Sequence, residues 1–247
     1  MIVEDPSVRR AERFSAIVDL GLAAWAARWP LYVLLVAALT ATQLLGAILA
    51  RYDPLIVAIV NACIDGFVAA FVSLDVAARF HGNVRGVREL ARAAIVRGPI
   101  VAALLLVLLF PNVLVQSSWL LGTPEETFYG ALILPALAAL GIFGISTAIA
   151  SLDEATPFYA VPGLSLLRSI MYAAVWPNLG RLTLAGAIVA VVLMFGELLD
   201  KWLAAHGIPA DRAGFWANVP VDALTVAPLQ AFFTYLYLDF TVREQRR

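Results

Sequence analysis

The chain has 247 residues, of which 62% are hydrophobic and 14% are charged, and its mean hydropathy is +0.87. A soluble domain carries about 25% charged residues, so this composition indicates a membrane protein. The net charge of −1 gives no overall attraction to nucleic acid, and the single cysteine, Cys63, excludes an intramolecular disulfide and a cysteine cluster for zinc or iron–sulfur.

Six stretches are apolar enough to cross a bilayer, which takes roughly 20 residues. Charged residues and prolines separate them, as in RYDP after the first stretch and GTPEET before the fourth. No cleaved signal peptide is evident, so we expect the first span to direct insertion and to remain in the protein. We predict an all-α polytopic membrane protein with a single integral membrane domain, residues 1–247. The predicted spans are residues 30–50, 54–80, 99–120, 128–150, 182–204 and 219–241.

The distribution of basic residues predicts the orientation. If the N-terminus is cytoplasmic, only Arg51, Lys201 and Arg212 of the 17 lysines and arginines fall on the outer side. Cytoplasmic loops retain Lys and Arg because these residues are unfavourable to translocate during insertion. We therefore predict that both termini are cytoplasmic.

Three cytoplasmic segments read as amphipathic helices that lie at the level of the lipid headgroups. They are expected near residues 8–28, 84–97 and 164–176. Each is followed by a proline at which a new span begins, and proline tolerates such a change of direction because it has no N–H to satisfy. The recurrence predicts three copies of one unit, composed of a surface helix, an outward span and a returning span.

Four stretches of the chain carry a family resemblance. They are FSAIVDLGLAAWAARWP, HGNVRGVRELARAAIVRGP, LLRSIMYAAVWPNLGRLTL and PLQAFFTYLYLDFTVREQ. With them the whole chain resembles the membrane domain of glycerophosphoryl diester phosphodiesterases and of related uncharacterised bacterial six-span membrane proteins. The resemblance implies a helical fold in the bacterial cytoplasmic membrane. It does not imply phosphodiesterase activity, because that family's chemistry belongs to a separate soluble barrel, for which this chain is expected to leave no room.

The sequence offers no set of residues typical of an active site. His81 and His206 fall on opposite sides of the membrane in the predicted topology, so they cannot share a site. Motifs for metalloproteases, serine hydrolases and phosphate-binding loops are absent from the sequence. We therefore expect a protein that is not an enzyme and that takes neither a cofactor nor a metal ion.

Two polar residues in the second predicted span form a candidate intramembrane site. Asp65 lies near the middle of that span and Asn61 precedes it by one helical turn. A central aspartate costs about 2.5–3.5 kcal/mol to insert, so it should face protein or water rather than lipid. It would serve either as a proton or cation relay or as an interhelical hydrogen bond. Glu197, the deepest acid of the fifth span, is added to the candidate site.

Other acids have simpler explanations. Asp75 and Asp239 each precede an arginine by four residues near the inner end of a span, which predicts a salt bridge within one helix. Asp222, at the start of the sixth span, is expected to lie near the outer surface, where hydrated charge is ordinary.

Two functions of different classes remain open at this point. The first is a scaffold or accessory subunit that engages anionic lipid headgroups, a membrane-protein partner or a second copy of the chain through a basic cytoplasmic face, and it has no nucleic-acid partner. The second is a small transporter or lipid-handling protein with a polar path through Asn61, Asp65 and Glu197. The arginines expected to contact headgroups or a partner are Arg85, Arg88, Arg92, Arg97, Arg168 and Arg181.

Overall fold

The computed structural model describes residues 14–49, 54–116, 126–153, 156, 160–208 and 210–245. Within these ranges the regular structure is entirely α-helical, which confirms the predicted class. The helices are α1 (Phe14–Ala26), α2 (Trp29–Leu49), α3 (Pro54–Phe80), α4 (Val87–Gln116), α5 (Glu126–Leu152), α6 (Val161–Ala173), α7 (Trp176–Ala205) and α8 (Ala210–Gln245).

Several of these helices are long and apolar enough to cross a membrane. In the described part of the chain three segments qualify by length and composition: Ile59–Phe80, Pro177–Ala205 and Pro220–Arg243. Helix α1 and the first part of α2 meet at an angle of 80° and would together provide a fourth. The 27 residues of α3 extend for about 40 Å, more than the roughly 30 Å of a hydrocarbon core. The chain is a helical membrane protein.

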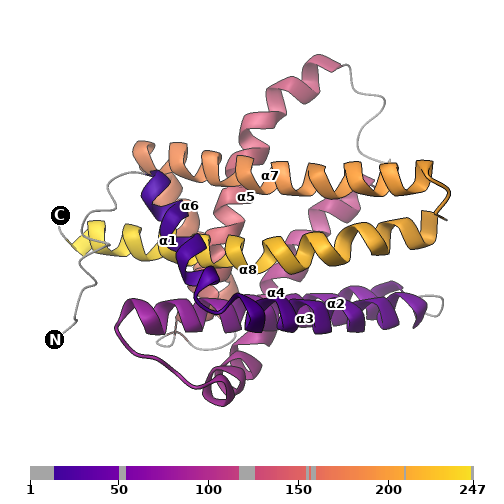
Figure 1. The fold of residues 1–247 in the computed structure, drawn as a ribbon. Helices are drawn as coiled ribbons and strands as arrows, with labels where there is room; N and C mark the ends of the chain where they lie inside the picture. The colour runs from indigo at the N-terminus through magenta and orange to yellow at the C-terminus, as the bar shows by residue number, and fades with distance from the viewer. Residues whose placement is uncertain are drawn as a thin grey trace.

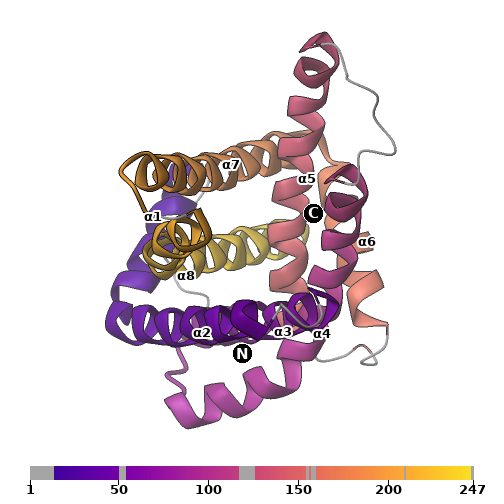
Figure 2. The ribbon, with the colours of Figure 1, turned by 90° about the vertical axis from the view of Figure 1, so that its right-hand side faces the viewer.

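The long helices follow two directions. Figure 1 shows α2, α3, α7 and α8 running alongside one another, while α4 and α5 cross them steeply. Figure 2, turned by 90°, shows α4 and α5 upright on one side of the other four. The short helices α1 and α6 lie at the same end of the bundle, where α7 begins and α8 ends.

Two of the predicted surface helices exist as separate elements. Helix α1 ends at Ala26 and α2 begins at Trp29, with Pro30 in its first turn. Helix α6 ends at Ala173 and α7 begins at Trp176, again with a proline at one of its first positions. A proline there loses nothing, because the first N–H groups of a helix have no partner within the helix.

The prediction for the third surface helix is wrong. We expected residues 84–97 to form a separate helix ending at Pro99, but α4 continues through this proline from Val87 to Gln116. Proline removes one hydrogen bond and bends a helix, yet packing on both sides can preserve the helix. Here Gly98, directly before Pro99, and Ala102, three residues after it, both lie against Gly66 of α3.

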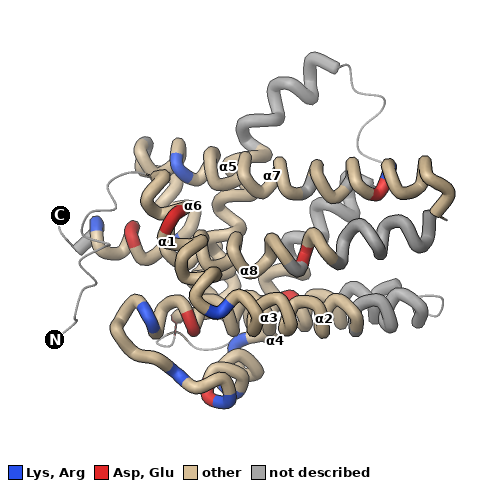
Figure 3. Tube along the Cα trace, viewed as in Figure 1, with Lys and Arg blue, Asp and Glu red and all other residues tan. Residues whose placement is uncertain are grey.

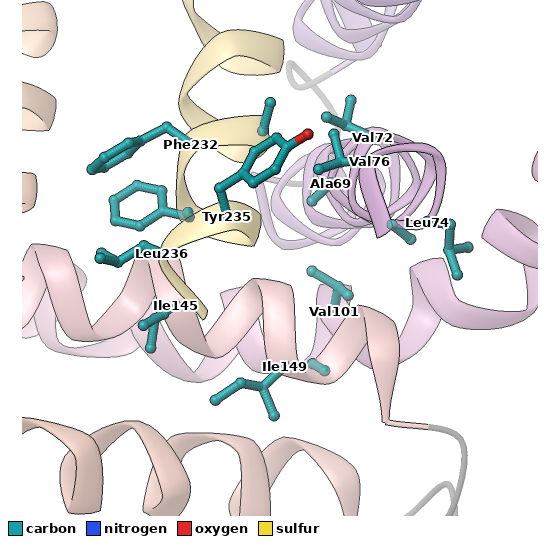
Figure 4. Close-up of a cluster of buried hydrophobic side chains, with 14 of the residues drawn as sticks. Ala69, Val72, Leu74, Val76, Val101, Ile145, Ile149, Phe232, Tyr235 and Leu236 are labelled. Atoms are coloured by element: carbon teal, nitrogen blue, oxygen red, sulfur yellow. The ribbon is translucent and has the colours of Figure 1, made fainter. Parts of the chain in front are cut away.

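Three of the long helices form the centre of the bundle, and the other three pack around them. Helices α3, α5 and α8, each the second of two successive long helices, all contact one another. Their apolar side chains meet in the core, where Figure 4 places Val72 and Val76 of α3, Ile145 of α5 and Leu236 of α8. Helix α4 packs mainly on α3, α7 mainly on α5, and α2 mainly on α8.

Glycines allow two of these pairs to approach to backbone contact. A Cβ added to Gly66 of α3 would lie 2.4 Å from the carbonyl oxygen of Gly98 on α4. A Cβ added to Gly186 of α7 would lie 1.7 Å from the carbonyl oxygen of Leu137 on α5. Small residues at such contacts are a common means of packing helices in membranes, where the hydrophobic effect does not drive helices together.

Candidate functional site

Charged residues gather at the end of the bundle where α1 and α6 lie, while the described parts of the helices beyond it carry few (Figure 3). Three aspartates at this end, Asp75, Asp153 and Asp239, each contact arginines. These three residues and their arginine partners are called the charged end below. Each aspartate follows a leucine: Leu74-Asp75 and Leu238-Asp239 lie in the last two turns of α3 and α8, and Asp153 comes directly after Leu152, the last residue of α5.

The first cluster surrounds Asp75, whose side chain is fully buried. Arg79, one turn later on α3, forms a salt bridge with Oδ2 of this aspartate, as the spacing predicted. Arg28, between α1 and α2, places Nη1 3.2 Å from Oδ1. The hydroxyl of Tyr32, on α2, donates a hydrogen bond to the same carboxylate. The cluster therefore connects α2, α3 and the α1–α2 junction, and its two arginines outnumber its one acid.

The cluster at Asp239 repeats this arrangement at the end of α8. Its Oδ2 accepts a hydrogen bond from Nε of Arg243 at 2.7 Å, again one turn later on the same helix and as predicted. Nη1 of Arg181, from the first turns of α7, donates to the same oxygen at 2.8 Å. One carboxylate is again shared by two arginines, one from its own helix and one from the start of another.

Asp153 is held by two arginines from other elements. Nη1 of Arg168, on α6, donates to its Oδ2 at 2.7 Å. Nη1 of Arg97, on α4, donates to the backbone carbonyl oxygen of Asp153 at 2.6 Å. The backbone N–H and hydroxyl of Thr156 also donate to the carboxylate. This aspartate joins α4, α5 and α6 at the point where α5 ends.

Neutral hydrogen bonds join three helices next to the charged end. Nε2 of Gln230 on α8 donates to Oγ of Ser73 on α3 at 2.8 Å, and Oγ1 of Thr147 on α5 donates to Oε1 of Gln230 at 3.1 Å. Oγ1 of Thr234, one turn beyond Gln230, lies 3.1 Å from the same serine oxygen. All four side chains are buried. These residues are called the central network, and they connect α3, α5 and α8.

The predicted intramembrane residues do not come together as one site. Asp65 lines a small cavity of about 20 Å³ with Thr40 of α2 and Asp222 of α8. Two polar residues of other helices thus line the same cavity, while Asp65 itself is exposed. The Oδ1 atom of Asn61 is buried and has no hydrogen-bond partner within the described residues. Glu197 belongs to α7, and its side chain lies outside the described part of the structure.

The arginines predicted to contact headgroups differ in their surroundings. Arg88 and Arg92 are exposed on α4, opposite the buried Leu90 and Ala94, which supports the predicted amphipathic pattern. Arg85 lies 3.5 Å from the exposed Glu89. The other three, Arg97, Arg168 and Arg181, are held by the aspartates of the charged end.

Two neighbouring hollows lie beside these arginines. The first has a volume of about 590 Å³ and is bounded by α6, the start of α7 and the end of α8; Arg168, Tyr172, Asn178 and Arg243 are among the residues that line it. The second, of about 980 Å³, is an apolar groove between α5 and α7. Pro177 lines both.

Sequence reasoning missed several contacts of these sites. Asp222 was expected near the outer surface, yet it shares a cavity with Asp65. Arg28 and Tyr32 were not expected beside Asp75, because their approach depends on the bend between α1 and α2. One available signal was overlooked: three of the four Leu-Asp pairs in the sequence place the aspartates of the charged end, and the fourth is Leu199-Asp200 on α7.

The known proteins add no assignment to this geometry. Comparison with protein-family models, with curated proteins and with solved structures gives no match. Among the described residues, no group of three or more His, Cys, Asp or Glu side chains is placed to hold a metal ion.

Proposed function

We propose that the protein is a non-enzymatic scaffold or accessory subunit of the bacterial cytoplasmic membrane, whose basic face engages anionic lipid or a protein partner. The observation that carries this proposal is the charged end. There each of two buried or nearly buried aspartates is shared by two arginines, so among the described residues each cluster has more basic than acidic side chains. The exposed Arg88 and Arg92 extend this basic surface along α4. Basic groups near the membrane surface are attracted to the anionic headgroups of lipids.

The proposal includes six spans with both termini cytoplasmic, built from three repeated units. Its support is the packing order: α4 packs on the preceding α3, α7 on the preceding α5, and α2 on α8, as a closed ring of three units requires. Because α4 and α5 cross the other long helices steeply, the three units would be equivalent in their helix contacts and not in their tilt (Figure 1).

Reporter fusions test the topology part of the proposal. A fusion after Arg247 should report a cytoplasmic position, and one near Glu126 should report the opposite side. Either result reversed would contradict the six-span topology. The repeat is tested separately, by superposing residues 14–80, 87–152 and 161–245 in an experimental structure. Unrelated rotations for the second and third units would contradict the repeat and leave the topology intact.

The lipid part is tested by measuring which lipids accompany the protein. Extraction with a patch of native membrane, followed by mass spectrometry of the lipids, should show a higher anionic fraction than in the bulk membrane. Replacement of Arg85, Arg88 and Arg92 by Gln should lower that enrichment, because Arg85 directly precedes α4, Arg88 and Arg92 are exposed on it, and none of the three side chains contacts an aspartate of the charged end. A lipid composition equal to that of the bulk membrane would contradict the proposal.

A second candidate function, proton or cation transport, is favoured by one observation. Asp65 of α3 and Asp222 of α8 line the same cavity, and two acids at this depth are expensive unless they have a task. Against it, the cavity holds about 20 Å³, scarcely the space of one water molecule. Proton uptake into proteoliposomes, followed by a pH-sensitive dye, separates the two functions. The scaffold predicts no uptake, whereas a relay predicts uptake that Asp65→Asn abolishes.

A further inference from the structure

The hollow beside Arg168 has the features of a site for an anionic headgroup. It lies between α6, the start of α7 and the end of α8, and its volume of about 590 Å³ is within the range of about 300–1,000 Å³ that ligand pockets span. Arg168 and Arg243 line it from α6 and α8, and Asn178 adds an amide. It also lies at the N-terminal end of α7, where the helix dipole favours an anion.

The described charges around this hollow are mostly positive. Arg168 donates to the carboxylate of Asp153, Arg97 donates to the backbone carbonyl oxygen of the same residue, and Arg243 and Arg181 share the carboxylate of Asp239. Among the described residues, four arginines thus accompany two carboxylates, and neither carboxylate lines the hollow. The side chains of Arg168 and Arg243 are 46% and 37% exposed, so both remain accessible while held in place. Arginines fixed in this way bind phosphate oxygens through charge-assisted hydrogen bonds.

The adjoining groove determines what kind of anion would bind. It runs between α5 and α7, and Leu137, Ile142, Leu179 and Leu184 line it. Pro177 lines both the groove and the hollow, so an apolar chain can leave the basic hollow directly into the groove. A soluble phosphate compound would occupy only the basic hollow. A phospholipid would occupy the hollow with its headgroup and the groove with an acyl chain.

The outer surface of α6 places this hollow at the membrane boundary. Leu167, Ile170 and Met171 are 52%, 49% and 63% exposed, and they lie beside Arg168 on the same short helix. Large apolar side chains exposed next to an arginine are typical of a helix that lies in the interface, with its apolar face in the acyl region. The hollow is therefore at the depth where headgroups meet acyl chains.

We propose that this site holds one anionic phospholipid, with its phosphate group between Arg168 and Arg243 and an acyl chain in the groove between α5 and α7. The proposal rests on the proposed function, since it names one defined site on the same basic face. It differs in predicting a stoichiometric, slowly exchanging lipid rather than a general enrichment around the protein.

Native mass spectrometry of the full chain in detergent, titrated with dioleoyl phosphatidylglycerol, tests the site. One lipid should bind well below the concentration at which further copies attach, and phosphatidylcholine with the same chains should bind at least about tenfold more weakly. Arg168→Gln with Arg243→Gln should remove this preference. Arg88→Gln with Arg92→Gln is the matched control and should retain it, because these two arginines lie outside the hollow.

Because the arginine variant loses two salt bridges and would not fold if they are essential, a second variant fills the groove without changing charge. Gly180 lines the groove, and a Cβ added there meets nothing within 4 Å, so Gly180→Phe can introduce a ring at the groove from a position with open space. Gly163, on α6, has equally open surroundings but lines neither hollow. Gly180→Phe should weaken binding of the first lipid by at least about tenfold, and Gly163→Phe should leave that binding unchanged.

The outcomes separate this site from the proposed function. Equal binding of the first lipid by wild type, Gly180→Phe and the Arg168/Arg243 variant would overturn the site, even if the native membrane patch is enriched in anionic lipid. Displacement of the lipid by millimolar inorganic phosphate, with the acyl chain making no difference, would also overturn it in favour of a soluble anion. Absence of any anionic enrichment in the membrane patch would instead overturn the proposed function.

Discussion

At the charged end, α3 and α8 each hold an aspartate between two arginines, whereas the central network joins the same two helices through Ser73 and Gln230. The difference lies in the partners rather than in the depth, because Ser73 precedes Asp75 by only two residues on α3. A buried charge is costly unless an opposite charge and hydrogen bonds accompany it, and the arginines supply both. The neutral side chains of the central network satisfy one another without charge.

The two regions also differ in what they leave available to a ligand. Every side chain of the central network is buried, so its polar groups serve only the contacts among α3, α5 and α8. At the charged end the aspartates are buried while several of their arginines remain partly exposed. A carboxylate that fixes an arginine without covering it gives a surface that is both rigid and basic. The charged end can therefore bind a ligand, whereas the central network only joins helices.

Loss of the Asp75 carboxylate should have the largest effect on stability. Asp75→Ala leaves Arg28 and Arg79 without their shared acid and Tyr32 without its acceptor. Removing one partner of a buried ion pair costs about 3–5 kcal/mol, because the remaining charge stays buried and unpaired. The free energy of unfolding in detergent, followed by circular dichroism, measures the loss.

Glu89→Ala is the control for this prediction. Glu89 is exposed and lies 3.5 Å from Arg85, so its loss should cost less than about 1 kcal/mol. Equal losses for the two variants would mean that the cluster at Asp75 is as weak as a surface pair. The contrast between the charged end and an ordinary basic surface would then disappear.

A side chain at Gly186 should have the next largest effect, because it would separate α5 from α7. The Cβ alone would lie 1.7 Å from a backbone oxygen of Leu137, and a backbone atom cannot move aside as a flexible side chain can. Gly186→Leu should cost about 1–3 kcal/mol or more by forcing the helices apart. Gly180→Leu, two turns earlier in α7, has open space around it and should leave the melting temperature nearly unchanged. Similar melting temperatures for both variants would contradict the close packing of α5 on α7.

The sequence predicted elements best where local signals decide them. The second predicted span, residues 54–80, coincides with α3, because a proline begins the helix and a His-Gly pair follows its end. The salt bridges Asp75–Arg79 and Asp239–Arg243 were predictable because both partners occupy one helical face. The continuity of α4 through Pro99 was not predictable, because it depends on packing against Gly66, a residue more than thirty positions away.

The candidate site was less accessible to sequence reasoning for the same physical reason. Asp65 was identified from its depth, but its neighbour Asp222 belongs to another helix, and only the fold brings the two into one cavity. The Arg168 and Arg243 pair likewise comes from α6 and α8, 75 positions apart. Periodicity and spacing report on one helix at a time. Contacts between helices need the three-dimensional arrangement.

Loss of the Gln230 amide should have the smallest of these effects, although this side chain is the centre of the central network. Gln230→Leu removes the hydrogen bonds to Ser73 and Thr147, but Ser73 keeps its contact with Thr234, and Thr147 keeps its bond to the carbonyl oxygen of Gly144. Interhelical hydrogen bonds in membranes are worth about 0.6 kcal/mol on average and at most about 1.7 kcal/mol.

A double-mutant cycle of Gln230→Leu with Ser73→Ala isolates the pair, and unfolding in detergent should give a coupling energy within that range. Thr183→Ala is a suitable reference, because this hydroxyl bonds only to the carbonyl oxygen of Leu179 in its own helix among the contacts described. A loss for Gln230→Leu as large as that for Asp75→Ala would reverse the comparison. The neutral hydrogen bonds of the central network, rather than the arginine–aspartate clusters of the charged end, would then be the dominant polar contribution to the bundle.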